Sequence, residues 1–341
     1  MISVVVIGKN EETRIGRCMQ SVRDAMGVML HEIVYVDSRS TDSSVQIARR
    51  WGARCYVLSD ERTTAGLGRL VGTKEAEGEY LLFLDADMQL RRGFLEKAMM
   101  AMAQEGFDGA TGIRDDIYMK DGKLLSRVNN YFGCHAQRIT PEFGGALFIK
   151  KEALEKAGGW SADTIACEEA ELHARIKDAG LRIVELPVPM ITHTDAVCHN
   201  RGLLKTLFSK RRLGEGQALR CAMAAGKARA YMQHEREKFT LFCADLACLA
   251  LLLIYPAMGF LIGCFVQMMQ LGFFLSKKAP ARLRLPEALL LLSAAGVAHL
   301  PSPQPRVYKA ITYSTRKGVS YDENQLHDRR LQRRKVPRRA A

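Results

Sequence analysis

Short apolar runs, separated by turn residues and amphipathic stretches, fill the first part of the chain. Ile2 to Ile7 is a β-branched run, and Tyr80 to Leu84 is an apolar run that ends in two carboxylates. Two further short runs lie between them, at residues 32–36 and 54–58. Runs of this length favour buried strands of a parallel sheet. The pattern therefore predicts four strands before residue 86.

Helical patterns alternate with these strands. Strands and helices that alternate through short links are typical of an α/β fold with a Rossmann-like, mostly parallel sheet flanked by helices. The helices are expected at residues 13–22, 44–51, 64–77 and 93–105. Further along, we expect strands at 109–114, 146–149 and 181–186, helices at 151–157 and 168–179, and a polar loop at 115–123. Residues 188–196 follow the last of these strands and carry His193.

The composition changes at residue 239. Residues 239–275 contain one charged residue, Asp245, and Tyr255 to Gly259 predicts a turn near the middle. The stretch is too long for one membrane-spanning helix and nearly long enough for two, so we expect a hairpin of apolar helices that spans or re-enters a membrane. A third apolar stretch, 285–300, predicts an interfacial helix. The alternative is a helical pair packed in a soluble core or dimer interface.

These patterns divide the chain into an α/β domain over 1–215, a linker or amphipathic helix over 216–238, hydrophobic membrane-associated helices over 239–300 and a basic tail over 301–341. The net charge is +13, and residues 276–341 carry fifteen Lys or Arg but four Asp or Glu. Basic residues beside apolar segments are typical of the cytoplasmic side of a membrane. We therefore expect a membrane-associated protein whose α/β domain faces the cytoplasm, with no nucleic acid as a partner.

The cysteines and the first residues agree with a cytoplasmic domain. The nine cysteines are dispersed and include no C-x-x-C pair, a pattern that favours reduced thiols. The apolar start of the chain is interrupted by charge between Lys9 and Arg14, so it does not predict a signal peptide.

Two carboxylates, Asp85 and Asp87, follow the fourth predicted strand. Residues spaced i, i+2 on a strand share one face, roughly 6.6 Å apart. Open α/β sheets bind ligands at the carboxyl ends of their strands. Like charges there repel each other unless a cation or a proton lies between them, and carboxylate oxygens favour Mg²⁺ or Mn²⁺, usually together with a phosphate. The pair predicts a metal and phosphate site, or else a solvated acidic turn.

Six segments, in the same order, resemble the family 2 glycosyltransferases, which have a GT-A fold. The resemblance covers roughly residues 1–215 and implies an enzyme that takes its sugar from a nucleotide-diphosphate donor. The segments are Val4–Glu12, the D-x-S-x-D turn at Val36–Asp42, Gly66–Arg69 before Ala76–Tyr80, the D-x-D at Asp85–Asp87, Gly144–Ala146 before Lys150–Glu152, and Glu168–Leu172 with Arg175 and Gly180.

Several residues are candidates to bind the donor. A carboxylate at a strand end, such as Asp37, can accept a hydrogen bond from the N–H edge of a base. A glycine at position 8 would let the backbone approach the nucleotide closely. Basic side chains at Arg69 and around Lys210 can pair with phosphate, although a solvated surface is the alternative for both. The donor-binding candidates are Gly8, Lys9, Glu11, Asp37, Arg69, Asp85, Lys210 and Arg211.

The resemblance also implies a metal and a catalytic base. Asp87 is the expected direct ligand of Mg²⁺ or Mn²⁺, and Asp85 is expected in the ribose or metal surroundings. His193 follows a strand and is either a third metal ligand or an ordinary hydrogen-bonded histidine. An inverting transfer needs a carboxylate to deprotonate the acceptor hydroxyl. The resemblance places that base at Glu169, and the register leaves Glu168 open.

The region 209–220 lacks the Q-x-x-R-W of processive synthases, so we expect transfer of a single sugar. The apolar C-terminal part indicates a lipid-linked or glycan acceptor, and the turn after Asp37 resembles that of uridine-binding members, which favours a UDP-sugar. Arg175 is expected to pair with Glu171 one helical turn earlier. The alternatives are a retaining GT-A transferase, a nucleotidyltransferase and a membrane scaffold with a weak donor site.

Overall fold

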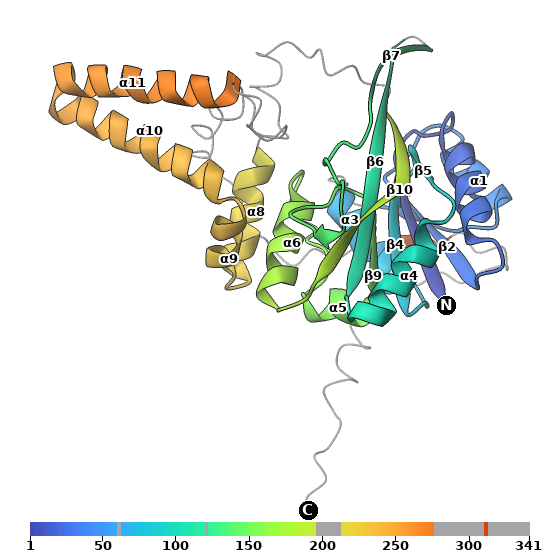
Figure 1. Ribbon diagram of the computed structural model, residues 1–341. Coiled ribbons are helices and arrows are strands. Elements are labelled where there is room, and N and C mark those ends of the chain that lie inside the picture. Colours follow the sequence, from blue (N-terminus) through green and yellow to red (C-terminus); the bar gives the residue numbers. More distant parts are fainter. Residues whose placement is uncertain (60–62, 121, 196–212, 276–309, 313–341) are drawn as a thin grey trace, which may run out of the picture. The chain divides into compact units, whose positions relative to one another are not determined.

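The computed structural model describes residues 1–59, 63–120, 122–195, 213–275 and 310–312 of the 341-residue chain. Within these residues the chain forms two compact units (Figure 1). The first unit contains residues 1–162 and 181–195 with strand β11 (Ala310–Thr312), and the second contains 163–180 and 213–275. Helix α6 (Glu168–Asp178) belongs to the second unit, although the predicted domain ran without a break to residue 215.

The four predicted strands at the start of the chain and the three helices between them are confirmed. The strands pair in parallel in the order β3-β2-β1-β4, because each crossover passes through a helix. The strands are β1 (Ile2–Gly8), β2 (His31–Asp37), β3 (Arg54–Leu58) and β4 (Tyr80–Asp85). The helices are α1 (Ile15–Met26), α2 (Ser44–Arg50) and α3 (Ala65–Glu75).

The second half of the sheet is mixed, so the prediction of a mostly parallel sheet is wrong there. Strand β9 is antiparallel to both β4 and β6, and β5 is antiparallel to β10. Strand β5 follows β4 directly, without the crossover helix that a parallel neighbour would need. The elements of this half are β5 (Met88–Leu90), α4 (Phe94–Glu105), β6 (Gly109–Lys120), β9 (Leu147–Lys150), α5 (Lys151–Lys156) and β10 (Ile183–Asp195).

The predicted loop at residues 115–123 is also wrong. Strand β6 runs through to Lys120 and forms an antiparallel hairpin with β7 (Lys123–Val128), with Gly122 at φ +75° at its tip. Asp115 and Asp116, two of the polar residues that predicted a loop, are strand residues with hydrogen-bonded side chains. Strands β10 and β8 (Arg138–Ile139) pair as well, and β10 is a bulged strand that continues to Asp195, beyond the strand predicted at 181–186.

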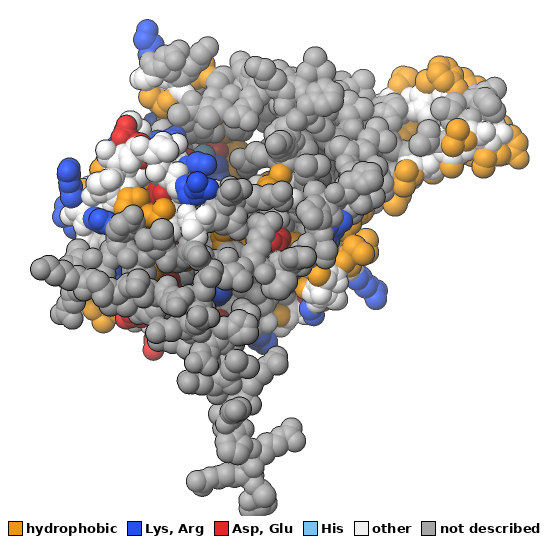
Figure 2. Space-filling model, turned by 180° about the vertical axis from the view of Figure 1, so that it is seen from behind, with side chains coloured by type: hydrophobic (Ala, Val, Ile, Leu, Met, Phe, Trp, Pro, Cys, Tyr) orange, Lys and Arg blue, Asp and Glu red, His pale blue; other side chains and the backbone are white. Residues whose placement is uncertain are grey.

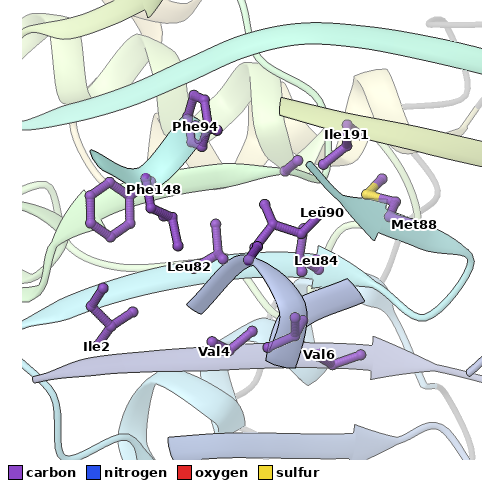
Figure 3. Packing of buried hydrophobic residues seen from close by; sticks show 14 of the residues in the cluster. Ile2, Val4, Val6, Leu82, Leu84, Met88, Leu90, Phe94, Phe148 and Ile191 are labelled. Atoms are coloured by element: carbon purple, nitrogen blue, oxygen red, sulfur yellow. The ribbon is translucent and has the colours of Figure 1, made fainter. Parts of the chain in front are cut away.

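The main apolar core lies on one face of the sheet. Because side chains alternate along a strand, Val4 and Val6 of β1 point to the face that also holds Leu82 and Leu84 of β4. Figure 3 shows these side chains together with residues of β5 and α4, including Phe94. Helices α1 and α4 pack their apolar residues into this core, and α3 covers the opposite face.

The second unit is helical. It contains α6, α8 (Leu213–Ala224), α9 (Ala228–His234), α10 (Arg236–Ile254) and α11 (Pro256–Leu275). Helices α10 and α11 pack against each other, and Figure 2 shows hydrophobic side chains over their surface. None of the helices in the described ranges combines the length and apolar character that crossing a membrane requires. The expectation of a spanning hairpin is therefore not supported. The interfacial helix at 285–300 and the basic tail lie outside the described residues, except for β11.

A glycine in α3 makes the packing of that helix on β1 testable. A Cβ atom on Gly72 would lie 2.2 Å from Val5 Cγ1, whereas one on Gly16 of α1 would lie 3.8 Å from its nearest neighbour, Ile47 Cγ2. We expect Gly72→Ala to lower the free energy of unfolding by about 1–3 kcal/mol because it overpacks this contact. Gly16→Ala, the matched control, is expected to be neutral or stabilising by up to ~1 kcal/mol. Urea unfolding followed by circular dichroism tests this, and equal stability of the two variants would contradict it.

Candidate active site

The register of three parallel strands brings the predicted acidic residues to one edge of the sheet. Gly8 of β1 lies opposite Asp37 of β2, and Ile7 of β1 lies opposite Asp85 of β4. The carboxyl ends of β2, β1 and β4 therefore meet side by side. This edge is where an open α/β sheet binds its ligands.

Asp37 holds the turn that follows β2. Its side chain is fully buried and accepts hydrogen bonds from Tyr35 Oη at 2.9 Å, from Ser40 N at 2.6 Å and from Ser40 Oγ at 2.6 Å. Arg39, between these residues, has φ +62°. The carboxylate thus closes an Asx-type turn, and a contact between Asp37 and a base stays a prediction.

The loop after β1 is tied to the turn after β2. Asn10, with φ +57°, donates from its backbone N to Ser40 Oγ at 2.7 Å, and its side-chain oxygen accepts from Thr41 N at 2.9 Å. Glu11 N donates to Ser44 Oγ at 2.7 Å. These bonds join the loop at residues 9–12 to the turn at residues 38–44, and we call the two together the rim.

Gly8 and Lys9 lie at the start of this rim. A Cβ atom on Gly8 would come within 2.8 Å of Ala86 Cβ and 3.1 Å of Tyr35 Oη, so the position has no room for a larger residue. Close packing of β1 against its neighbours already requires this glycine. Lys9 is exposed beside it.

Glu11 is a half-buried carboxylate with a cation beside it. Arg14 binds it with two hydrogen bonds, Nε to Oε2 at 2.6 Å and Nη2 to Oε1 at 2.9 Å. Burial and the nearby charge of Asp87 raise the pKa of Glu11 to about 7, although Arg14 opposes the shift. Arg14 Nη1 also donates to the carbonyl of Thr194 at 3.1 Å, which links this loop to the end of β10.

Asp85 is paired with a buried arginine. Arg69 of α3 is 1% exposed, and its Nη2 donates to Asp85 Oδ1 at 2.9 Å. The guanidinium lies over the ring of Trp160, 4.9 Å from its centroid. A Cβ atom on Gly145 would fall 2.5 Å from Asp85 Oδ2, so the glycine pair of the sequence leaves room for this ion pair. Arg69 therefore orients Asp85 from within the protein.

Asp87 and His193 face each other across the start of β5. His193 Nε2 lies 3.3 Å from Asp87 Oδ2, and Asp87 Oδ1 is buried with no hydrogen-bond partner among the described residues. Met88 is the register partner of His193 in the antiparallel β5–β10 pair. Burial lowers the pKa of His193, but hydrogen bonds to Asp116 and Asp87 outweigh it and raise this pKa to about 9.

Two residues of β6 complete the cluster. Asp116 is 1% exposed, and its Oδ1 lies 3.2 Å from His193 Nδ1. Arg114 Nε donates to the same oxygen at 2.6 Å, and Tyr118 Oη donates to Oδ2 at 3.1 Å. Burial raises the pKa of Asp116, but its bonds to His193 and Arg114 prevail and lower it to about 2.

Arg114 and Asp116 were not among the predicted site residues, because the predicted strand ended at residue 114 and a loop was expected from residue 115. The signal that identifies them is the alternation Arg114, Asp116, Tyr118, which puts three polar groups on one face of a strand. In the parallel β6–β10 register Asp116 lies opposite His193. The two strands therefore bring the histidine and its carboxylate together.

The donor set at this edge fits a hard cation that is shared with a phosphate. No group of three or more His, Cys, Asp or Glu side chains in the described ranges is placed to hold a metal by itself. Mg²⁺ and related ions often bind through one or two protein ligands together with substrate phosphates. The unbonded Oδ1 of Asp87 and the adjacent Nε2 of His193 are the atoms that fit such a role.

The predicted base residues open helix α6 in the second unit. Glu168 is 5% exposed and Glu169 is half-buried, and Cys167 precedes them with φ +67°. The predicted pair of Arg175 with Glu171 is confirmed, with Nη2 to Oε2 at 2.6 Å. The assignment of the base to Glu169 or Glu168 stays a prediction. Lys210 and Arg211 lie outside the described residues.

The raised pKa of His193 predicts how the metal-free protein responds to pH. The folded chain holds this proton more tightly than the unfolded chain, whose histidine pKa is about 6.5. The resulting stabilisation, about 3 kcal/mol, is complete below about pH 6.5 and is lost as the pH rises through about 9. In EDTA, the stability advantage of the wild type over His193→Gln should therefore shrink between pH 7 and pH 10. Thermal unfolding checks this, with the exposed His135→Gln as control, and parallel curves for wild type and His193→Gln would contradict it.

Part of the chain matches a known protein family, and several known proteins are similar to it. Residues 3–160 match the family described as Glycosyl transferase family 2. The 4,4'-diaponeurosporenoate glycosyltransferase of Staphylococcus haemolyticus is 29% identical over 136 residues, which are 38% of this chain and 36% of that protein. The succinoglycan biosynthesis protein ExoA of Rhizobium meliloti is 25% identical over 276 residues, 74% of this chain and 78% of its own length. The chain thus spans about a third of the first relative and about three quarters of the second.

Two solved structures have a similar fold. TarS 1–349 of S. aureus, in complex with UDP-GlcNAc, has a TM-score of 0.54 and 18% identity, covering 70% of this chain and 72% of that one. The mannosyltransferase PcManGT of Pyrobaculum calidifontis, in complex with GDP-Man and Mn²⁺, has a TM-score of 0.50 and 19% identity, covering 87% and 80%. At these identities the likeness is one of fold. Residues 3–160 thus resemble glycosyl transferase family 2, and the fold of the chain is similar to that of these two glycosyltransferase structures.

Proposed function

We propose that this chain is an inverting glycosyltransferase. It moves a single sugar from a nucleotide-diphosphate donor to a hydroxyl or phosphate of a lipid-linked or glycan acceptor. The observation that carries the proposal is the parallel register of β2, β1 and β4, which sets Asp37 and Asp85 at one edge, directly before Asp87. This is the edge at which a nucleotide binds in open α/β sheets.

The donor is a nucleotide-diphosphate sugar. Two proteins of similar fold were solved with UDP-GlcNAc and with GDP-Man and Mn²⁺, which supports this class of donor. We favour a UDP-sugar because the turn after Asp37 is similar to that of uridine-binding members. The rim built from Glu11 and Asp37 would hold the nucleoside, and Asp85, fixed by Arg69, would lie toward the ribose.

Asp87 and His193 would hold Mg²⁺ or Mn²⁺ together with the donor phosphates. The bound ion would neutralise the diphosphate as it departs. The protein's own groups prepare this position in two ways. Asp87 keeps one oxygen without a hydrogen-bond partner among the described residues, and the β5–β10 pairing fixes His193 opposite it.

The transfer itself is a direct displacement. The carboxylate of Glu169, or of Glu168, takes the proton from an acceptor hydroxyl. The oxygen then forms a bond to the anomeric carbon while the bond from that carbon to the diphosphate oxygen breaks. The electron pair of the broken bond leaves with the nucleoside diphosphate, and the anomeric configuration inverts.

The exposed apolar surface of the second unit supports a proposal for the acceptor and the location. Apolar side chains of α10 and α11 that are more than half exposed support contact with lipid, among them Leu253, Phe260, Leu261, Phe265 and Met268. We therefore propose that the protein lies at a membrane, with its GT-A domain on the cytoplasmic side and next to a lipid-linked acceptor.

Removal of Asp87 tests the donor site. We expect Asp87→Ala to lower the rate of sugar transfer by at least about 100-fold, because it removes the carboxylate that binds the cation and so several kcal/mol of charge stabilisation. Glu96→Ala changes an exposed carboxylate on α4 and should leave the rate unchanged. The assay screens UDP- and GDP-sugars with Mn²⁺ and then with EDTA. Transfer that is indifferent to both EDTA and Asp87→Ala would rule out the metal role.

Replacement of the two glutamates tests the base. We expect Glu169→Gln to lower the rate of transfer by about 10²–10⁴-fold, because an amide cannot take the acceptor proton, while donor binding is retained. Glu168→Gln, with the same change one residue earlier, is the matched control and would take the role if its loss were the larger. The anomeric configuration of the product, from NMR, is the second measurement. A retained configuration would remove the base role from both residues and favour the retaining alternative.

A further inference from the structure

We propose that Asp116 is a positioning residue for the metal site. Its carboxylate accepts the Nδ1–H of His193 and thereby leaves the Nε2 lone pair of the ring directed toward Asp87, where Mg²⁺ or Mn²⁺ would bind. This inference rests on the proposed function, because it takes Asp87 and His193 as the residues that hold the cation. It assigns a role to a strand residue whose side chain is buried.

The ring of His193 has two competing neighbours at Nδ1. Asp116 Oδ1 lies 3.2 Å from this nitrogen, and Arg114 Nη2 lies 3.0 Å from it. An ionised carboxylate can only accept a hydrogen bond, and a guanidinium can only donate one. Asp116 therefore requires a proton on Nδ1, whereas Arg114 requires a lone pair there. Which neighbour prevails decides the tautomer of the neutral ring.

The tautomer decides whether the other nitrogen can bind a metal. With the proton on Nδ1, the Nε2 atom carries a lone pair, and it lies 3.3 Å from Asp87 Oδ2. With the proton on Nε2, that lone pair is lost and the position is closed to a cation. Histidines that bind metals commonly donate their other N–H to a carboxylate, which fixes both the tautomer and the orientation of the ring.

The protein holds Asp116 firmly in this position. Its side chain is 1% exposed, and Arg114 binds both of its oxygens, which keeps it ionised and limits its rotation. Tyr118 donates only to Oδ2, the oxygen that does not contact His193. Asp116 and His193 are register partners in the parallel β6–β10 pair, so the backbone also fixes their separation. Asp116 therefore contacts both Arg114 and His193, so Arg114 is not the only charged partner of Nδ1.

The first test measures Mn²⁺ binding to the full chain in the presence of UDP, with UDP alone as the blank, by electron paramagnetic resonance of the free ion. We expect Asp116→Asn to weaken Mn²⁺ binding by about 10- to 100-fold, because Arg114 then becomes the sole charged partner of Nδ1. Tyr118→Phe, which removes a different hydrogen bond to Asp116, should bind Mn²⁺ like the wild type. Asp87→Ala should remove the site.

The second test detects the coordinated nitrogen. Electron spin echo modulation of bound Mn²⁺ should show ¹⁴N coupling from an imidazole in the wild type and in Tyr118→Phe. This coupling should be absent in His193→Gln and reduced in Asp116→Asn. A merely structural role of Asp116 would lower the thermal midpoint without removing the ¹⁴N signal.

The outcomes separate the two proposals. If Asp87→Ala weakens Mn²⁺ binding but Asp116→Asn keeps wild-type affinity and ¹⁴N coupling, the role of Asp116 is overturned and the metal site stands. The role is also overturned if Tyr118→Phe weakens binding as much as Asp116→Asn, or if the wild type shows no ¹⁴N coupling. If Asp87→Ala binds Mn²⁺ like the wild type, both proposals fail.

Discussion

The concentration of negative charge at one edge of the sheet is the constraint on which the site depends. The parallel register places Asp37 and Asp85 side by side, and Glu11, Asp87 and Asp116 lie on the adjoining loop and strands. Carboxylates this close repel one another unless each has a compensating group. The turns, strands and helices around this edge supply the compensating groups.

The compensation differs from one acid to the next. The charge of Asp37 is compensated by hydrogen bonds from the hydroxyl of Tyr35 and from the amide and hydroxyl of Ser40, and these bonds order the turn. Asp85 has the guanidinium of Arg69, which α3 brings up from the opposite face of the sheet and which Trp160 covers. Because an arginine does not lose its proton, these pairings are permanent features of the fold.

The sequence predicted the part of this arrangement that depends on local pattern. Four apolar runs and their links determine β1 to β4, and the positions of Asp37, Asp85 and Asp87 at the strand ends follow directly. The mixed half of the sheet was not predictable in this way, because the partner of a strand such as β9 is chosen by tertiary packing and not by its own residues.

The same limit explains the residues that were missed or assigned differently. Asp116 lies in a polar stretch whose composition is typical of a loop, and only its pairing with β10 turns it toward His193. Arg69 is typical of a helix surface in the sequence, yet α3 packs so closely through Gly68 and Gly72 that the arginine is buried. Long-range contacts of this kind leave no periodic signal in the chain.

Asp87 differs from its neighbours in the nature of its partner, and this difference supports its role. Asp85 and Asp116 are each bound by an arginine, which can be neither deprotonated nor a metal ligand. Asp87 is bound by Nε2 of His193, whose other ring nitrogen contacts Asp116; this ring can give up its proton and offer a lone pair toward Asp87. In the Asp87–His193 pair, the proton on the histidine can therefore be replaced by a cation. A sheet edge built in this way is stable without a metal and can bind one together with the donor phosphates.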